Sequence, residues 1–433
     1  MINPRPRPGS APSVTVPLSY LVAAALAFIT AALGVVWLAP ELAGHYYHPR
    51  VVALTHTVTL GWITLTIMGA SFQLIPIVLE RPIWSERLAR WQFWIVVLSV
   101  AGMVGHFYVG TWPGLLAAAA LLTMGVAMYL LNVGLSLRGF SRWDFTARLV
   151  VLGYVGLALT VIFGLLLGAD RIGSFLPGEF FPRLQAHFHL ALLGWVAPMV
   201  MGVAARVYPM FLLAPEPGGW PARLQLWGLL VGVPAVVLGL LGVSALIVPG
   251  ALAVALAALG HALWVVRMAR HRKRPQLDWG LRFVLTGTVF LLPVTALGLG
   301  FALDLFSGPH LGSSYAVLVL GGWVSLTIVG MMLKIVPFLV WYRVYSPQAG
   351  KAPVPTLAQL SWPGGEVSAY LLLTGGMVLL PVAVAAGEAE WIRAAGAVLS
   401  LGALAFGVTV AHILHHLTGA VRANPATAQV HAR

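Results

Sequence analysis

The sequence contains no cysteine, and this absence excludes several kinds of site. Disulfides, thiolate metal sites, thiolate-ligated haem and covalent haem attachment through a CxxCH motif all need that residue. Charge is also scarce, because only 9% of the 433 residues are charged, whereas a soluble domain carries about 25%. A water-exposed surface cannot be built from so few charges. Most of the chain must therefore lie in a membrane, and its 13 histidines are the main metal ligands left.

Apolar runs recur along the whole chain, and a helix of about 20 residues crosses a hydrocarbon core of about 30 Å. The first run is too long for a cleavable signal peptide, so it should remain as the first helix. The pattern predicts a single transmembrane domain over residues 17–418, between tails over 1–16 and 419–433. Twelve spanning helices are expected near residues 17–40, 51–79, 92–110, 114–137, 147–168, 184–213, 224–246, 247–269, 281–305, 311–342, 366–386 and 392–417.

The net charge of +13 marks orientation in the membrane and does not indicate nucleic acid as a partner. When successive loops are assigned to opposite sides, one side holds only Arg50, Arg171, Arg183 and Arg393. The other side holds the remaining 21 of the 25 Lys and Arg, since 25 − 4 = 21. The positive-inside rule then predicts a multi-pass protein of the inner (cytoplasmic) membrane with both tails in the cytoplasm. The basic run at 267–274 is expected to face lipid headgroups there.

The chain contains an internal repeat that predicts its architecture. The segment His56–Pro76 aligns without a gap with His189–Pro209, so that His, Gly-Trp, Gly and Pro coincide at a separation of 189 − 56 = 133 residues. A third copy ends at Pro337 and keeps the Trp, Gly and Pro spacing, with Val317 in the histidine position. Three copies of four helices predict an all-α, pseudo-threefold bundle of about twelve helices. A major-facilitator transporter would instead show two sets of six.

Five histidines are expected near one level in the outer half of the membrane. His56, His187 and His189 lie near the outer starts of the second and sixth helices, whereas His106 and His310 lie at the outer ends of the third and tenth. Ionisable side chains inside a bilayer are costly and are usually functional. A single histidine could form a hydrogen bond between helices, but two at repeat-equivalent positions favour ligation of a cofactor.

The spacing of the pair on the sixth helix favours two neighbouring cofactors. His187 and His189 are two residues apart, which places them about 200° apart around a helix. They cannot bind one metal ion from the same face, and neutral imidazole is a standard axial ligand of haem iron. A zinc or copper site would favour ligands at i and i+4. We expect structural or solvent-exposed roles for the others near the surface, His45, His48, His412, His415 and His416, although an inner metal site at the last three is an open alternative.

The segment AHFHLALLGWVAPMVMGVAARVYP, Ala186–Pro209, resembles the haem-ligand helix of heme-copper oxidase subunit I. That helix carries Ala-His-Phe-His, a glycine thirteen residues beyond the second histidine and a proline twenty beyond it. The resemblance implies that His187 ligates a high-spin haem and His189 a low-spin haem. The second helix is similar to the low-spin-haem helix of nitric oxide reductase catalytic subunits, which implies His56 as a ligand. His56 and His189 are then expected to share one iron.

Two departures from that family affect the expected chemistry. The His-x-His helix of the oxidases is the tenth, whereas here it is the sixth, and no motif matches the histidines that bind copper in the family. NnrS proteins, which contain haem and are tied to nitric oxide handling, have similar patterns, including a stretch like Gly202–Val207. The resemblance therefore implies a reduced, copper-poor member of the superfamily.

The function expected from these observations is a haem-binding membrane protein that handles electrons or a diatomic gas, NO or O2. One or two b-type haems are implied as cofactors, copper is not expected, and an electron-donor or other respiratory subunit is the implied partner. Two alternatives remain open. One is an active terminal oxidase or nitric oxide reductase, an oxidoreductase with a second metal held by His106, His261 or His310. The other is a transporter or chaperone of haem or copper.

Overall fold

The computed structural model describes residues 13–78, 82–216 and 218–423. Within these ranges the regular elements are helices, and twelve helical spans are long and apolar enough to cross a membrane, as the sequence predicts. The predicted tails fall largely on residues 1–12 and 424–433, which lie outside the described ranges.

The elements in chain order are α1 (Thr15–Trp37), α2 (Ala39–Leu42), α3 (Pro49–His56), η1 (Thr57–Thr64), α4 (Leu65–Val78), α5 (Glu86–Val109), α6 (Trp112–Ser136), α7 (Phe145–Gly173), α8 (Phe180–His189), η2 (Leu190–Val196), α9 (Ala197–Leu212), α10 (Trp220–Leu240), η3 (Ser244–Leu246), α11 (Ile247–Arg270), α12 (Trp279–Ala302), α13 (Pro309–Val317), η4 (Leu318–Ser325), α14 (Leu326–Val344), η5 (Ser346–Gln348), η6 (Leu357–Leu360), α15 (Pro363–Ala386) and α16 (Ala389–Ala423).

Three of the spans begin with a side-chain cap, which fixes where each helix starts. Ser85, Asp144 and Asp278 each accept a hydrogen bond from a backbone N–H three residues later, at 2.9–3.1 Å. These caps satisfy a backbone donor that no helical carbonyl can reach. The cap at Ser85 starts α5 at Glu86, six residues before the start at 92 that hydropathy predicts, because the first turn of the helix is charged. Ser85 followed by the charged residues of the first turn indicates this helix start in the sequence, whereas the apolar pattern alone does not.

Three composite spans occupy the centre of the molecule, and each changes from α to π geometry at the same point of the repeat. The π-helical segments η1, η2 and η4 begin one residue after His56, His189 and Val317. π-helical turns are rare and are frequent at functional sites. We call the span from α3 to α4 central helix one, that from α8 to α9 central helix two and that from α13 to α14 central helix three.

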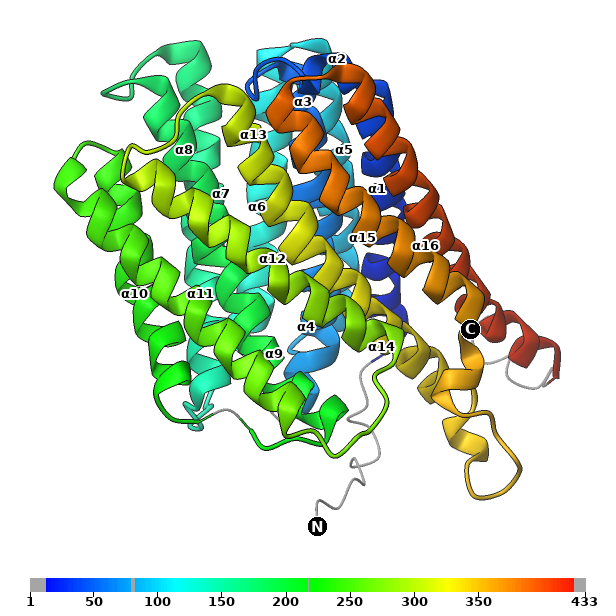
Figure 1. The fold of residues 1–433 in the computed structure, drawn as a ribbon. Coiled ribbons are helices and arrows are strands. Elements are labelled where there is room, and N and C mark those ends of the chain that lie inside the picture. Colours follow the sequence, from blue (N-terminus) through cyan, green and yellow to red (C-terminus); the bar gives the residue numbers. More distant parts are fainter. Residues whose placement is uncertain (1–12, 79–81, 217, 424–433) are drawn as a thin grey trace.

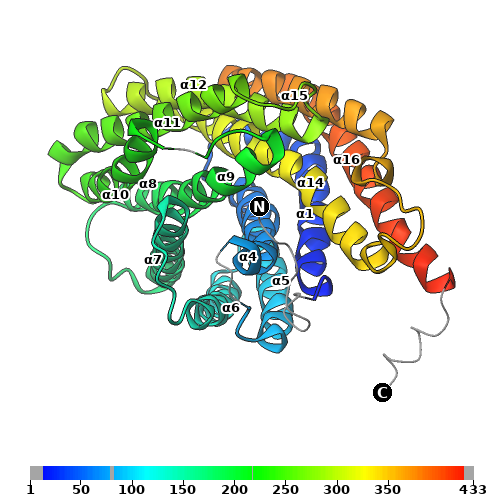
Figure 2. The same ribbon diagram turned by 90° about the horizontal axis from the view of Figure 1, so that it is seen from below.

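The remaining nine spans form three arcs, each of which closes the gap between two central helices (Figure 2). We call the three regions sectors. The first sector, between central helices one and two, is closed by α5, α6 and α7. The second, between two and three, is closed by α10, α11 and α12, and the third, between three and one, is closed by α15, α16 and α1. This arrangement is the predicted pseudo-threefold bundle of four-helix repeats.

The repeat tryptophans join the central helices where they meet. Trp62 donates to the hydroxyl of Ser325 at 3.0 Å, and Trp195 donates to the hydroxyl of Thr64 at 3.3 Å. Each acceptor lies two residues after the tryptophan of its own repeat. The hydrogen bonds therefore follow one direction around the axis: the tryptophan of repeat one donates to repeat three, and the tryptophan of repeat two donates to repeat one. In repeat two the acceptor position is Ala197, which has no hydroxyl, so the ring of three bonds cannot close there.

Candidate haem-ligand site between the central helices

The starts of α3, α8 and α13 lie together on one side of the bundle, at the top of Figure 1. His56 is the last residue of α3 and is half-buried. Its Nδ1 lies 2.9 Å from the carbonyl oxygen of Val52, and since a carbonyl can only accept, Nδ1 carries the proton. The ring stacks on Phe107 of α5, with centroids 4.7 Å apart. His56 therefore faces the first sector and keeps the lone pair of Nε2 for a metal.

His189 repeats this arrangement one repeat later in the chain. It ends α8, and its Nδ1 lies 2.8 Å from the carbonyl oxygen of Gln185. Its ring lies nearly parallel to that of Tyr315 on α13, with centroids 6.3 Å apart and planes 24° apart. Histidines that bind metals usually donate their other ring N–H to a carbonyl or carboxylate, which fixes the tautomer. Both repeat-equivalent histidines thus have the hydrogen bond that an axial ligand needs.

His187 points to the opposite face of the same helix and into the first sector. A Cβ atom placed on Gly164 of α7 would lie 2.9 Å from its Cε1, and Phe163 meets the ring edge-on at 6.0 Å. The Nδ1 of His187 is buried and has no hydrogen-bond partner among the described residues. A buried imidazole nitrogen without a partner is costly and indicates a missing group, such as a ligand or water.

These contacts distribute the three histidines between two sectors. His56 and His187 both face the first sector, whereas His189 faces Tyr315 across the second. The sharing of one iron by His56 and His189 stays a prediction. Tyr315 was missed because the sequence was searched for histidines alone. The signal was present, since Tyr315 lies two residues before Val317, as His187 lies two before His189.

His106 and His310 are held at helix ends, away from the rings described above. The Nδ1 of His106 lies 2.7 Å from the hydroxyl of Thr111, beyond the end of α5, and its ring packs on Gly114. The ring of His310 lies against Gly387, where a Cβ would be 2.9 Å from Cε1. No three His, Asp or Glu side chains in the described part of the chain are grouped so that they could hold a metal ion. The structure thus does not gather the five predicted histidines into one cluster.

His261, the third histidine of the alternative copper set, is engaged elsewhere. It is buried on α11, and its Nδ1 lies 3.1 Å from the side-chain oxygen of Gln225 on α10. The amide of Gln225 in turn donates to the carbonyl of Pro221 at 3.3 Å. This chain of bonds links α10 to α11 inside one arc. His261 therefore forms a hydrogen bond between two helices.

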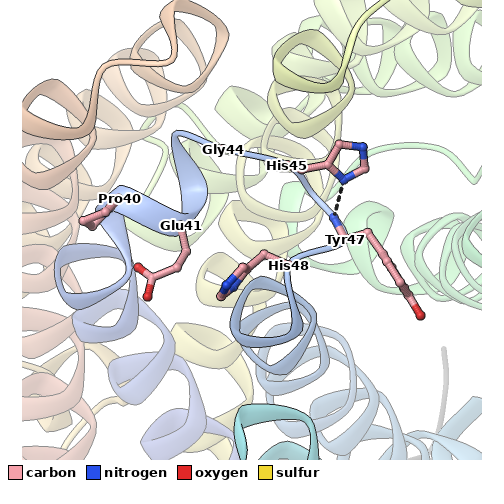
Figure 3. Close-up of a pocket in the computed structure, with 6 residues that line it drawn as sticks. All are labelled: Pro40, Glu41, Gly44, His45, Tyr47 and His48. Carbon is pink, nitrogen blue, oxygen red and sulfur yellow. Dashed lines mark hydrogen bonds between the residues drawn. The ribbon is translucent and has the colours of Figure 1, made fainter. Parts of the chain in front are cut away.

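The loop after α2 forms an open hollow of about 490 Å³ on the side where the central helices start (Figure 3). The side chains of Glu41 and His48 point toward one another, whereas His45 points away and accepts a bond from the N–H of Tyr47. Burial alone would raise the pKa of Glu41, but the Arg50 hydrogen bond and the nearby positive charges hold it below its usual value. Burial raises the pKa of Tyr47. The hollow is lined by residues of α2 and of the loop that follows it.

No family model and no curated protein matches the sequence. Among solved structures, the fold is similar to a heme-copper terminal oxidase dimer solved by cryo-EM, with a TM-score of 0.68. The match covers 92% of this chain and 84% of that one, at 12% sequence identity. The chain has a heme-copper oxidase fold. At this identity the likeness establishes the fold alone.

Haem is named in the description of that oxidase structure, and the side chains described above can be compared with what that group needs. An axial ligand needs a neutral imidazole with a fixed tautomer and one free nitrogen. His56 and His189 meet this requirement through their bonds to Val52 and Gln185. The unpartnered nitrogen of His187 is a further donor in the first sector. The fit rests on His56 and His189, because the Nδ1 of His187 has no hydrogen bond that would fix its tautomer.

Proposed function

We propose that this membrane protein binds b-type haem between its central helices and uses it to pass electrons or to bind a diatomic gas, NO or O2. The observation that carries the proposal is the shared geometry of His56 and His189, whose Nδ1–H groups are held by carbonyl oxygens four residues earlier. The fold, similar to that of a heme-copper terminal oxidase, supports it. The absence of cysteine excludes covalent attachment through a CxxCH motif, so the haem proposed is a non-covalently bound one such as b-type haem.

Haem would supply one-electron redox chemistry and a coordination position for a gas. The contribution of the chain is to orient its ligands and to exclude water. The backbone bonds of His56 and His189 set the ring orientations, and the apolar arcs keep the environment of low dielectric constant. We further propose that the protein lies in the inner membrane with both termini in the cytoplasm, receives electrons from another subunit, and carries no stoichiometric copper.

The test is to purify the protein from membranes with haem supplied, then record reduced-minus-oxidised and pyridine haemochrome spectra together with metal analysis. We expect a b-type haem signal that is lost or reduced in His56→Ala and in His189→Ala. His261→Ala is the matched control, because His261 is a buried transmembrane histidine that bonds to Gln225. A well-folded protein without haem would overturn the proposal.

Oxidoreductase activity is the second candidate, and the likeness to a terminal oxidase favours it. It requires a second metal beside the haem, for which about three imidazoles must converge on one ion. Metal analysis with O2 and NO consumption assays separates the two candidates. One copper per chain with turnover that is lost in His106→Ala or His310→Ala would favour the enzyme. Gas binding without turnover would favour a haem protein that does not react alone.

A further inference from the structure

Three histidines lie near the end of α16, on the side of the bundle opposite to the starts of α3, α8 and α13 (Figure 1). They are His412, His415 and His416, and the proposed function uses none of them. His412 and His416 are four residues apart, so they lie on one face of the helix, one turn from each other. Two imidazoles at i and i+4 on one helix face are the arrangement with which many zinc-binding helices hold their ion.

The two rings already lie close together in the folded protein. The ring centroids of His412 and His416 are 6.1 Å apart, with an angle of 86° between the planes. Ile413 is fully buried, so this turn of α16 is packed against the bundle and its backbone is held in place. A metal bound by both Nε2 atoms at about 2.0–2.1 Å needs the rings somewhat closer. The exposed His412 side chain can reach that position by turning about its own bonds.

Tyr345, which follows the last residue of α14, orients one of the two rings. Its hydroxyl oxygen lies 2.8 Å from the Nδ1 of His416. In the tautomer that can bind a metal through Nε2, Nδ1 carries the proton and donates to the phenol oxygen. Histidines that bind metals usually donate their other ring N–H to an oxygen, which fixes the orientation and the tautomer of the ring. Tyr345 therefore links a candidate ligand on α16 to central helix three.

His415 has a different environment and is less well placed. At 100° per residue it lies about 60° from His412 around the helix, whereas His416 lies about 40° away on the other side. The hydroxyl of Thr418 donates to the carbonyl oxygen of His415 at 2.7 Å, so its oxygen can accept a bond from the Nδ1 of His415, 3.3 Å away. His415 is exposed and has no contact with α14 that would orient it. It is therefore the matched control for the other two.

We propose that His412 and His416 form a binding site for a divalent transition-metal cation such as Zn²⁺ at this end of α16. Imidazole nitrogen suits Zn²⁺, Ni²⁺ and Cu²⁺, whereas Mg²⁺ and Ca²⁺ prefer oxygen ligands. The described residues offer no set of three His, Asp or Glu that could enclose an ion, so water fills the other coordination positions. The site is open and exchangeable, unlike a structural zinc site with four protein ligands. The proposal does not depend on haem.

The test is isothermal titration of Zn²⁺ into the purified protein, prepared without a histidine tag and treated with a chelator, with Mg²⁺ as the control ion. The wild type should bind Zn²⁺ and not Mg²⁺. Tyr345→Phe should weaken Zn²⁺ binding about 10- to 100-fold, as the loss of a bond that orients a ligand does. His412→Ala and His416→Ala should weaken it at least as much, and His415→Ala should keep the wild-type affinity.

An unchanged Zn²⁺ affinity in His412→Ala or in His416→Ala would overturn the proposal, as would an equal loss in His415→Ala. A second measurement uses the wild type alone and does not depend on how a variant folds. Diethyl pyrocarbonate modifies exposed imidazoles, and Zn²⁺ should protect His412 from it, as measured by peptide mass spectrometry. His271, an exposed histidine whose Nδ1 lies 2.8 Å from the carbonyl oxygen of Arg267, should stay reactive. Equal modification of His412 with and without Zn²⁺ would contradict the assignment.

Discussion

The first and third sectors share one backbone plan but differ in the residues at two positions. Each lies between two central helices with a π-helical segment and is closed by an arc of three spans. The first sector presents His56 and His187, and the third presents Val317 and Leu54. The repeat therefore supplies the scaffold, and the sectors differ in the side chains at these two positions. The predictions below test this separation of scaffold from ligand.

The largest effect is expected when the first sector is disturbed without changing a ligand. Gly164→Ala should displace the His187 ring, because the added Cβ would lie 2.9 Å from its Cε1 on a helix that cannot easily yield. The haem signal should therefore be reduced. Reduced-minus-oxidised spectra measure the change.

The matched control for that change is Gly168→Ala, one turn further along α7. There the added Cβ meets only Leu116, at 4.0 Å, which is an ordinary van der Waals contact. The spectrum should be that of the wild type. Equal loss of signal in both variants would mean that α7 cannot tolerate alanine, and that the His187 contact is not the cause.

The sequence was sufficient for the scaffold because the signals for it are local. Apolar length predicts the spans, and the recurrence of Trp, Gly and Pro predicts the threefold plan. The pairing of ligands could not be obtained in the same way. A helical wheel separates His187 from His189, but it does not say which neighbour each ring meets. That depends on the order of the arcs, which only the assembled bundle shows.

The π-helical segments and the tryptophan hydrogen bonds also could not be predicted from the sequence. Tryptophan was visible as a repeat feature, but its acceptors, Thr64 and Ser325, lie on other repeats. The sequence does not show that a hydroxyl two residues after one tryptophan accepts a hydrogen bond from the tryptophan of another repeat. That contact exists only when the three central helices are placed around an axis. His106 and His310 share the expected depth of the other histidines, but each is held at a helix end by contacts of its own.

A smaller effect is expected at the axis, where the scaffold and not the ligand is changed. Ser325→Ala leaves the buried Trp62 indole N–H without its acceptor, and an unsatisfied buried donor costs about 1–3 kcal/mol. Unfolding by a denaturing detergent should shift accordingly, and the haem signal should remain. Loss of haem from this variant would contradict the separation of scaffold from ligand.

Ala197→Ser should raise the stability of the protein, because it supplies the hydroxyl that is missing from the ring of three tryptophan hydrogen bonds. Interhelical hydrogen bonds in membranes average about 0.6 kcal/mol, so the gain in stability should be of that order. The same unfolding assay measures it. The expectation holds only if Trp323 donates to the new hydroxyl, so the double variant with Trp323→Phe should lose the gain.

The smallest effect is expected in the outer loop, which contributes no ligand to any sector. Glu41 accepts a bond from Arg50 at 2.8 Å, and its pKa is held below its ordinary value of 4.5. A carboxylate whose pKa is lowered in the folded state stabilises the protein above its unfolded pKa, and this stabilisation is lost as the pH falls through the folded pKa.

Because the Arg50 side chain is 45% exposed, solvent screens the pair and its contribution should be roughly 0.2–1 kcal/mol. Glu41→Gln should therefore lower the melting temperature slightly at pH 7 and not at all once the pH lies below the lowered pKa of Glu41 in the folded state, where both proteins carry a neutral side chain. The haem signal should be that of the wild type across this range. A loss of haem from this variant would show that the loop shapes the first sector, and the sector could then no longer be described by the residues at its two positions alone.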